Sequence, residues 1–398
     1  MKNNRTFLEK LLDGAKVEWR TIDEVSNKVS SGGTPATSNN SYYENGNIPW
    51  LRTQEVDFKE IWDTDIKITE EGLNNSSAKW IPKNCVIVAM YGATVGKIAI
   101  NKIPLTTNQA CANIEVNPEI AHYRYVFHYL MSKYEYIKSL GSGSQTNINS
   151  QIVKKIRIPI PPLSVQTEIV KILDALTALT SELTSELTLR RKQYEYYREK
   201  LLSFDSLEQL NMGGAKKKLI DVAIYAKVRI SADKLNKENY VGVENLLQNK
   251  LGKTSSNYVP TEGSFIEYLP NDILIGNIRP YLRKIWLADK TGGTNGDVLV
   301  IRLTDKNILP RYLYHILANE HFFEYNIKYS KGAKMPRGDK AAILQYEFDV
   351  PSLEEQHRIV SILDKFETLT NSITEGLPLA IEQSQKRYEY YRELLLSF

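Results

Sequence analysis

The residues of this chain that could contact a ligand are cations, amides and hydroxyls grouped in glycine-bearing segments. In the first half, the segment Gly92-Ala93-Thr94-Val95-Gly96-Lys97 looks like a phosphate-binding loop. It has one residue too few between its glycines, and Ile98 stands where a serine or threonine is needed, so we do not expect it to bind a nucleotide. Its backbone amides and Lys97 could instead meet a phosphate of DNA.

A second polar segment of the first half is Gly141-Ser142-Gly143-Ser144-Gln145-Thr146-Asn147. Glutamine and asparagine can bond an adenine edge through two hydrogen bonds, and serine can bond a phosphate. The alternative is an ordinary polar loop. The DNA contacts that we predict for this half are Arg52, Lys97, Asn108, Gln109, Ser144, Gln145 and Thr146.

The second half places more cations in the corresponding positions. Asn277-Ile278-Arg279-Pro280-Tyr281-Leu282-Arg283-Lys284 mixes cations with an aromatic residue, and further lysines and an arginine surround Gly332 and Gly338. Such loops suit phosphate contacts, and arginine can also bond guanine. The alternative is a solvated charged loop. The contacts predicted for this half are Arg279, Tyr281, Arg283, Lys284, Asn295, Lys334 and Arg337.

Motifs for catalysis are absent from the sequence. There is no Asn/Asp-Pro-Pro-Tyr/Phe methyltransferase motif, no Walker A motif and no cluster of metal ligands, and the five histidines are scattered. His128 and His315 occupy equivalent positions of an internal repeat, and we interpret them as packing residues. We therefore predict a chain without catalytic or metal-binding residues, which is not itself an enzyme.

Composition is that of a soluble globular protein in a reducing cytoplasm. With 398 residues, the chain is long enough for at least two cores. Its residues are 42% hydrophobic and 25% charged, and no apolar run is long enough to span a bilayer. Cys85 and Cys111 are the only cysteines, which makes a disulfide framework or a zinc site improbable. A net charge of +4 does not identify a partner by itself.

The segments that we expect to position these loops form an internal sequence repeat. Residues 386–398 repeat residues 192–204, including Tyr-Glu-Tyr-Tyr-Arg-Glu and Leu-Leu-Ser-Phe, and the segment Pro161–Gln166 matches Pro351–Gln356. The repeat continues more faintly upstream, where Arg124-Tyr125 pairs with Arg311-Tyr312. Each half thus consists of a divergent module followed by a long helix of nearly copied sequence, which indicates one scaffold that presents two specificities. The alternative is a duplication followed by neutral drift, which would not by itself concentrate the similarity in the helices.

The long helices carry heptad seams. Ile169, Ile172, Leu176, Leu179 and Leu183 alternate in steps of three and four, and the second copy does the same from Ile359. Gly376-Leu377-Pro378 should break or kink the second helix. We expect the two helices to pair antiparallel, the alternative being that each packs only on its own module. The residues predicted for pairing or partner docking are Ile169, Ile172, Leu176, Leu183, Tyr194, Tyr197, Leu201, Ile359, Ile362, Phe366, Tyr388, Tyr391 and Leu395.

The predicted fold class is α+β, with two similar α/β target-recognition domains in a pseudo-twofold arrangement, separated by two long antiparallel coiled-coil helices. The predicted segments are a helical extension (1–18), a first domain (19–160), a central helix (161–204), a linker (205–217), a second domain (218–350) and a distal helix (351–398).

The central helix contains the tandem Thr180-Ser181-Glu182-Leu183-Thr184-Ser185-Glu186-Leu187. One such unit lengthens a helix by ~6 Å and turns its end by ~40°, while DNA turns by roughly 34–36° per base pair. We therefore hypothesise that helix length sets the distance between two DNA half-sites.

Over essentially the whole chain, this pattern resembles the specificity (S) subunits of type I restriction-modification systems. The features that carry the resemblance are two divergent domains, each followed by a repeated long helix, the motifs at Pro161 and Pro351, the tandem repeat, and the doubled Tyr-Glu-Tyr-Tyr-Arg-Glu endings. The opening Phe7-Leu8-Glu9-Lys10-Leu11-Leu12-Asp13-Gly14 is also similar to members of that family.

The resemblance implies that each domain reads one half of an asymmetric bipartite site in double-stranded DNA. It implies that the helices hold two methyltransferase (M) subunits, and that motor and nuclease (R) subunits can join. S-adenosylmethionine would then be bound by M, and ATP and magnesium by R, with no cofactor in this chain. The alternatives are the specificity subunit of a related type IIB-like system, a coiled-coil scaffold without a DNA function, and a nucleotide-binding enzyme acting through Gly92–Lys97.

Overall fold

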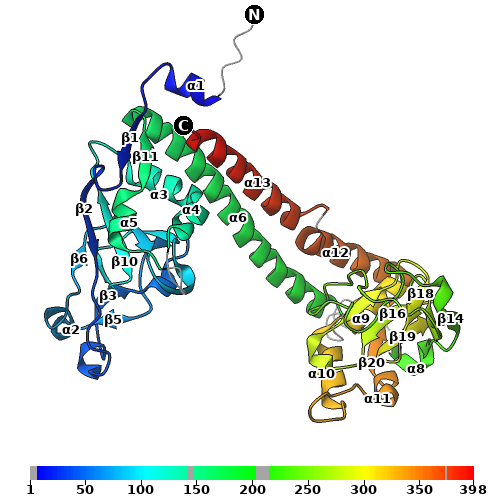
Figure 1. Ribbon diagram of the computed structural model, residues 1–398. Coiled ribbons are helices and arrows are strands. Elements are labelled where there is room, and N and C mark those ends of the chain that lie inside the picture. Colours follow the sequence, from blue (N-terminus) through cyan, green and yellow to red (C-terminus); the bar gives the residue numbers. More distant parts are fainter. Residues whose placement is uncertain (1–6, 142–146, 203–214, 373) are drawn as a thin grey trace, which may run out of the picture. The chain divides into compact units, whose positions relative to one another are not determined.

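The computed structural model describes residues 7–141, 147–202, 215–372 and 374–398 (Figure 1). The chain divides into two compact units, of which the first comprises Met1–Glu182 and Glu382–Phe398 and the second Leu183–Ile381. Each unit therefore contains one module, part of the long helix that follows this module, and part of the other long helix.

The first module is built on a central sheet with the strand order β2-β10-β7-β8-β4. Neighbouring strands are antiparallel except β4 and β8. Every residue of β7 and β8 is buried, which explains why these strands are apolar on both faces except at Asn101. The strands are β2 (Ser26–Ser31), β4 (Glu60–Ile61), β7 (Val86–Ala89), β8 (Ile98–Asn101) and β10 (Cys111–Val116).

A second sheet of this module has the order β5-β3-β9-β6, in which β3 and β9 are parallel. A separate antiparallel pair, β1 with β11, closes the module beside the start of the long helix. These strands are β1 (Glu18–Thr21), β3 (Ile48–Leu51), β5 (Lys67–Ile68), β6 (Trp80–Ile81), β9 (Leu105–Thr107) and β11 (Arg157–Ile160).

The second module repeats this plan. Its central sheet has the order β13-β19-β16-β17, which corresponds strand for strand to β2-β10-β7-β8, and β12 pairs with β20 as β1 does with β11. β12 begins at Ala215, inside the segment 205–217 that the sequence predicted as a linker. The strands are β12 (Ala215–Lys218), β13 (Ala223–Tyr225), β14 (Arg229–Ser231), β15 (Ser264–Tyr268), β16 (Ile273–Gly276), β17 (Ile285–Leu287), β18 (Gly292–Thr294), β19 (Val298–Leu303) and β20 (Glu347–Val350).

The helices of the modules also correspond. Tyr125 of α3 and Tyr312 of α9 are fully buried, and each hydroxyl donates a hydrogen bond to a backbone carbonyl, that of Pro159 (2.8 Å) or Asp349 (2.9 Å). The helices are α1 (Phe7–Leu12), α2 (Glu70–Asn74), α3 (Tyr123–Ser132), α4 (Tyr134–Ser139), α5 (Ser150–Lys155), α8 (Leu219–Val222), α9 (Pro310–Leu317), α10 (Glu320–Lys328) and α11 (Lys340–Leu344).

The central long helix α6 runs from Leu163 to Leu201, directly after the two prolines of its start signal. The distal segment forms two helices, α12 (Leu353–Asn371) and α13 (Leu377–Leu396). Gly376 precedes α13 with a φ of 82°, so the break predicted at Gly376-Leu377-Pro378 is confirmed.

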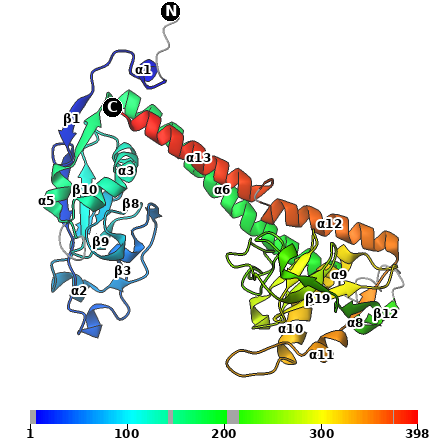
Figure 2. The ribbon, with the colours of Figure 1, turned by 45° about the vertical axis from the view of Figure 1, so that its right-hand side comes forward.

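In the first unit, the start of α6 and the end of α13 lie side by side (Figures 1 and 2). The Thr180 and Ser384 hydroxyls are 2.9 Å apart, whereas Leu395 shares one apolar core with Ile169. Contacts thus move toward the start of α13 as α6 proceeds, so the two helices run antiparallel.

The second unit contains the same arrangement. The rings of Tyr194 and Tyr197 in α6 stack on Phe366 of α12, with centroids 6.1 and 5.6 Å apart. Arg191, one turn earlier in α6, donates to the carbonyl of Thr370, one turn later in α12. The predicted antiparallel pairing is therefore confirmed within each unit.

The starts of α6 and α12 pack on their own modules as well as on the partner helix. Ile169 belongs to the core of the first module, and Ile359 and Leu363 belong to that of the second. The predicted seam is wrong at Leu179, which is 39% exposed, while Leu173 is fully buried. The module packs on one side of the helix. The buried stripe therefore faces both the module and the partner helix, whereas an a/d seam would face only the partner helix.

The repeated glutamines explain why the motifs at Pro161 and Pro351 are copied. Nε2 of Gln166 donates to the carbonyl of Pro161, and Oε1 accepts from the backbone amide of His122. Gln356 makes the same bonds with Pro351 and Leu309. Both glutamines are fully buried, so each one fixes the start of a long helix to its module.

Candidate nucleic-acid interface

The polar segments predicted from the sequence of the first module meet at one edge of its sheets. The amide of Met90 donates to Ala110, and that of Ile148 to Met90, at 2.8 and 3.0 Å. Asn108 donates to Leu51 (2.9 Å) because β3 and β9 are parallel neighbours. We call residues 52–55, 91–97, 108–110 and 147–148 the first loop edge. It contains the predicted residues Arg52, Lys97, Asn108 and Gln109.

Ser144, Gln145 and Thr146, which were also predicted to contact DNA, lie outside the described residues. Ile148, which follows them closely, is bonded to Met90 at the first loop edge. The described end of this segment therefore joins the other predicted contacts.

The second module builds an equivalent edge with the same backbone bonds. The amide of Asn277 donates to Asp297, and that of Gly338 to Asn277, at 2.8 and 3.1 Å. These bonds correspond to those that Met90 makes in the first module. We call residues 277–284, 295–297 and 331–338 the second loop edge. It contains all seven residues predicted for this module.

Several side chains of the first loop edge are already engaged within the chain. The Lys97 amine is 2.7 Å from an Asp57 oxygen, and the Asn108 amide oxygen lies 3.2 Å from the Cys111 thiol. Gln109 is exposed, with its amide oxygen bonded to the Thr34 hydroxyl. The half-buried Arg52 lies one residue after β3.

Some cations of the second loop edge are already paired within the chain. Arg283 pairs with Glu320 (2.7 Å), and Arg337 pairs with Asp297 (3.0 Å). The Lys284 amine donates to the carbonyl of Val243 (2.6 Å), and burial lowers the pKa of this lysine. Four of the predicted residues are exposed, namely Arg279, Tyr281 (46% exposed), Lys334 and the paired Arg337.

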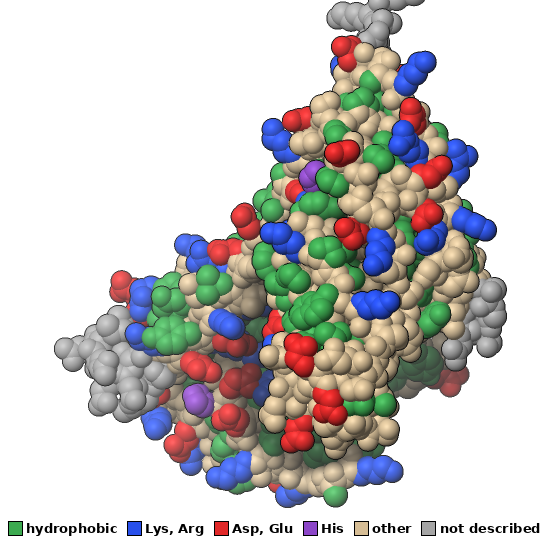
Figure 3. All heavy atoms as spheres, turned by 90° about the vertical axis from the view of Figure 1, so that its left-hand side faces the viewer, with side chains coloured by type: hydrophobic (Ala, Val, Ile, Leu, Met, Phe, Trp, Pro, Cys, Tyr) green, Lys and Arg blue, Asp and Glu red, His purple; other side chains and the backbone are tan. Residues whose placement is uncertain are grey.

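The charged side chains of the first unit's face in Figure 3 are mixed in sign. Lysines and arginines are interspersed with aspartates and glutamates, and apolar groups lie between them. On this face, a contact with an anion would depend on individual cations, because the charges form no uniformly positive patch.

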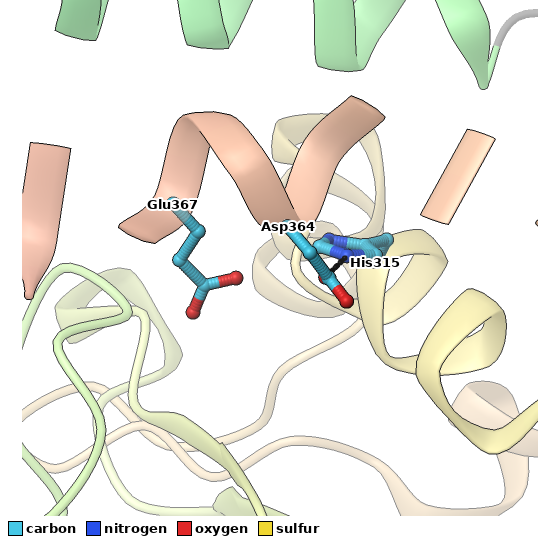
Figure 4. Close-up of side chains that lie close together, drawn as sticks. All are labelled: His315, Asp364 and Glu367. Carbon is cyan, nitrogen blue, oxygen red and sulfur yellow. Dashed lines mark hydrogen bonds and ion pairs between the residues drawn. The ribbon is translucent and has the colours of Figure 1, made fainter. Parts of the chain in front are cut away.

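An ion-paired cluster around a buried histidine attaches each module to its long helix. His315 of α9 is fully buried, with Nε2 2.9 Å from an oxygen of Asp364 in α12 (Figure 4). Arg311 binds the same aspartate and also Glu367, each at 2.8 Å. We call His315, Asp364 and Arg311 the second clamp.

The first clamp consists of His128, Arg124 and Asp174, at the equivalent positions of the repeat. His128 Nε2 and Arg124 lie 2.7 and 2.8 Å from Asp174, and Arg124 also pairs with Glu60. Burial lowers the pKa of both clamp histidines. Bonds from histidine and arginine hold the pKa of each clamp aspartate below its usual value, although desolvation opposes this.

The donor atoms of His315, Asp364 and Glu367 lie within 4.8 Å of one another, which is close enough for a metal ion. Arg311 binds both carboxylates, so a cation would have to displace its guanidinium. The first clamp also contains an arginine in this position, and we interpret both clusters as helix-to-module attachments. Both histidines are packing residues, as the sequence predicted, but their ion pairs were not predicted. The repeated Arg-x-x-x-His spacing was the available signal for them.

A solvent-facing stripe is identical in the two units. Its members in α6 are Lys192, Glu195, Tyr196 and Glu199, spaced as one helix face, and those in α13 are Lys386, Glu389, Tyr390 and Glu393. All eight are exposed, with Tyr196 at 57% and Tyr390 at 62%. We call these residues the shared stripe. The core of each unit does not require them, since the buried residues lie on the opposite helix face.

Comparison with known families matches both halves of the chain to one family. The family model described as "Type I restriction modification DNA specificity domain" matches residues 15–190 and 213–383. The chain belongs to the specificity subunits of type I restriction-modification systems. The two matches coincide with the repeat, so the S subunit carries the domain twice, as its duplicated sheets also show.

Relatives of this S subunit are similar along their whole length. A type I restriction enzyme specificity subunit of Haemophilus influenzae is 40% identical over all of both chains. The EcoR124I/EcoR124II specificity subunit of Escherichia coli is 31% identical and covers 99% of this chain and 97% of its own. The H. influenzae and E. coli proteins thus share both modules and both helical regions.

Solved structures support the fold. The S subunit of M. genitalium superposes with a TM-score of 0.58 at 15% identity, covering 96% of this chain and 97% of its own. A chain from a study of complex assembly and conformational transition in the type I system gives the same TM-score at 17% identity. Among the described residues of the present S subunit, no helix is both long and apolar enough to cross a membrane.

Proposed function

We propose that each module of this S subunit reads one half of an asymmetric, bipartite target in double-stranded DNA. The observation that carries the proposal is the loop edge, which is built twice by the same backbone bonds and furnished with different side chains. Base edges are distinguished by their patterns of hydrogen-bond donors and acceptors. Two modules with the same backbone arrangement but different polar side chains are therefore suited to two different base sequences.

The contacts that we propose for the first half-site come from Arg52, Lys97, Asn108 and Gln109, together with Ser144, Gln145 and Thr146. For the second they come from Arg279, Tyr281, Arg283, Lys284, Asn295, Lys334 and Arg337. Cations that are already paired, such as Lys97 and Arg337, must exchange a carboxylate for DNA or contact it through a second donor. Exposed side chains that are not engaged within the chain, such as that of Arg279, can bind without that exchange.

In this proposal, the S subunit is a non-catalytic component of a complex that acts in the cytoplasm. Two M subunits would bind S-adenosylmethionine and methylate adenine at N6, and R subunits would bind ATP and magnesium for movement and cleavage. The S subunit supplies recognition and assembly, consistent with a sequence that lacks motifs for these cofactors.

The shared stripe supports docking of two copies of one M subunit. Its residues are exposed and identical in the two units, while the loop edges of the same units differ. The predicted docking residues Ile169, Ile359 and Leu395 are fully buried inside the S subunit, so they stabilise its own helix packing. Tyrosine is among the residues that dominate protein interfaces, and the flanking glutamates favour a partner surface that carries lysine or arginine.

The length of α6 is proposed to set the spacing between the half-sites. This helix is continuous from Leu163 to Leu201 and includes both copies of the tandem at 180–187. A continuous helix transmits a change in length as a fixed translation and rotation.

The test is a map of N6-methyladenine in a host that expresses this chain together with its M subunit. We expect methylation at one bipartite sequence with two unequal half-sites and a constant, unspecified spacer. Methylation without sequence selection would contradict the proposal and favour a scaffold role.

A further inference from the structure

The turns that follow β7 and β16 have the same backbone conformation at two positions, but the residues at these positions differ between the modules. In the first module this turn lies between β7 and β8, and Gly92 and Gly96 have φ angles of 79° and 81°. In the second it lies between β16 and β17, and the equivalent residues are Arg279 and Arg283, with φ angles of 53° and 50°. The same left-handed positions are thus filled by glycine in one module and by arginine in the other.

Glycine adopts a left-handed conformation without the steric penalty that a Cβ atom brings, so arginine is the unfavourable choice at both positions. Such residues persist where a side chain is needed at that place. For Arg283 the structure provides a reason within the fold, because this arginine binds Glu320, which also binds Lys250.

No such reason exists for Arg279 within the described part of the chain. Its guanidinium is exposed and has neither a hydrogen bond nor an ion pair with any described residue. Its backbone is nevertheless held firmly. The amide donates to Pro336 at 2.7 Å, and the carbonyl accepts from Leu282 at 2.9 Å.

Building on the proposed function, we propose that Arg279 reads a guanine in the half-site of the second module. The guanidinium matches O6 and N7 of guanine through two parallel hydrogen bonds in the major groove. Its backbone is fixed before binding, which lowers the conformational cost of binding. The first module has Gly92 at this position and can offer only a backbone amide there, so it reads its half-site through other side chains.

A phosphate contact would explain these observations less well. Phosphate contacts carry no sequence information, and the exposed Lys334 on the same loop edge can provide one. A left-handed arginine at a position where the other module has glycine is explained by a contact that distinguishes two half-sites.

The experiment compares Arg279→Gly, Arg279→Lys and Lys306→Ala in the full S subunit assembled with its M subunits. Lys306→Ala is the control, because it also removes one positive charge. Lys306 is exposed and lies beyond the end of β19 that is opposite the second loop edge. Relative methylation rates are measured on duplexes in which each position of the second half-site carries each base. Thermal unfolding of each variant is measured alongside.

Arg279→Gly is expected to reduce the preference for guanine at one position by about tenfold or more. It should leave the first half-site unchanged and should not lower the unfolding temperature, because glycine suits this φ. Arg279→Lys should lose the same preference, and Lys306→Ala should keep it.

An unchanged preference in Arg279→Gly, on a wild-type background that still shows two half-sites, would overturn this inference and leave the proposed function standing. A uniform loss on all sequences that Arg279→Lys restores would also overturn it and assign a phosphate contact instead. A wild-type complex without a second half-site would overturn both.

Discussion

Nε2 of His315 lies 2.9 Å from an oxygen of Asp364, which joins a helix of the second module to the long helix α12. His128 and Asp174 form the same bond, at 2.7 Å, in the first unit. These bonds survived a duplication in which the loop edges diverged. The part of the S subunit that positions each module is therefore copied, and the part that would contact DNA is not.

The first prediction concerns the dependence of stability on pH. Burial lowers the pKa of His128 and His315 below the ordinary 6.5, so the unfolded chain binds more protons than the folded chain just below that pH. Stability should therefore be complete above pH 6.5 and should fall as the pH drops through it, by up to about 1.4 kcal/mol per histidine and pH unit. Thermal unfolding at pH 7.5 and 5.5 measures this.

The double variant His128→Gln/His315→Gln should lose most of that pH dependence. His321→Gln is the matched control, since its side chain is 69% exposed. A stability that rises on acidification to pH 5.5, or a double variant that titrates like the wild type, would contradict the assignment of neutral buried histidines.

The second prediction concerns Arg124, which pairs with Asp174 and Glu60. Arg124→Met removes the cation and leaves two partly buried carboxylates, so we expect a loss of about 2 kcal/mol in the free energy of unfolding. Chemical denaturation measures it, and Arg387→Met on the exposed face of α13 is the control. Equal stability of the two variants would show that the first clamp does not stabilise the unit.

The sequence predicted most of the architecture because the repeat constrained it. The prolines before α6 and α12 and the break at Gly376 are local signals, and the structure confirms both. The heptad spacing predicted the long helices but not every buried position on them. Leu179 was misplaced because a heptad pattern does not show that a module covers one side of the helix.

The candidate interface was predictable only as a set of loops. Polar, glycine-bearing segments identified both loop edges, but the sequence could not tell which cations are paired. Arg283 binds Glu320 and Arg337 binds Asp297, both across long or irregular connections, whereas Arg279 has no partner among the described residues. The left-handed conformation of Arg279 was likewise invisible, since no residue preference predicts it.

The third prediction concerns assembly through the shared stripe. Tyr196→Ser or Tyr390→Ser should each weaken binding of one M subunit by about tenfold or more, and the double variant should weaken both. Sedimentation or native mass measurement of the complex gives the number of M subunits per S subunit. Tyr258→Ser, at a residue that is 70% exposed in the second module, is the control and should assemble fully. Full assembly of the double variant would remove the stripe from the interface.

The fourth prediction concerns helix length. Deleting Thr184–Leu187 shortens α6 by ~6 Å and turns its end by ~40°, so the preferred spacer should shorten by about one base pair while both half-sites stay the same. Replacing the same four residues by alanine preserves the length and should preserve the spacer. Methylation mapping distinguishes the two variants, and an unchanged spacer in the deletion variant would eliminate the idea that helix length acts as a ruler.

The central claim, that two modules on copied helices read two separate half-sites, is tested most directly by exchanging one module. Residues 19–160 are replaced by the corresponding module of the E. coli relative, and N6-methyladenine is mapped in a host that expresses the hybrid with its M subunit. We predict that one half-site changes and that the other half-site stays as in the wild type. A hybrid that methylates with both half-sites altered, or with neither altered, would contradict the claim.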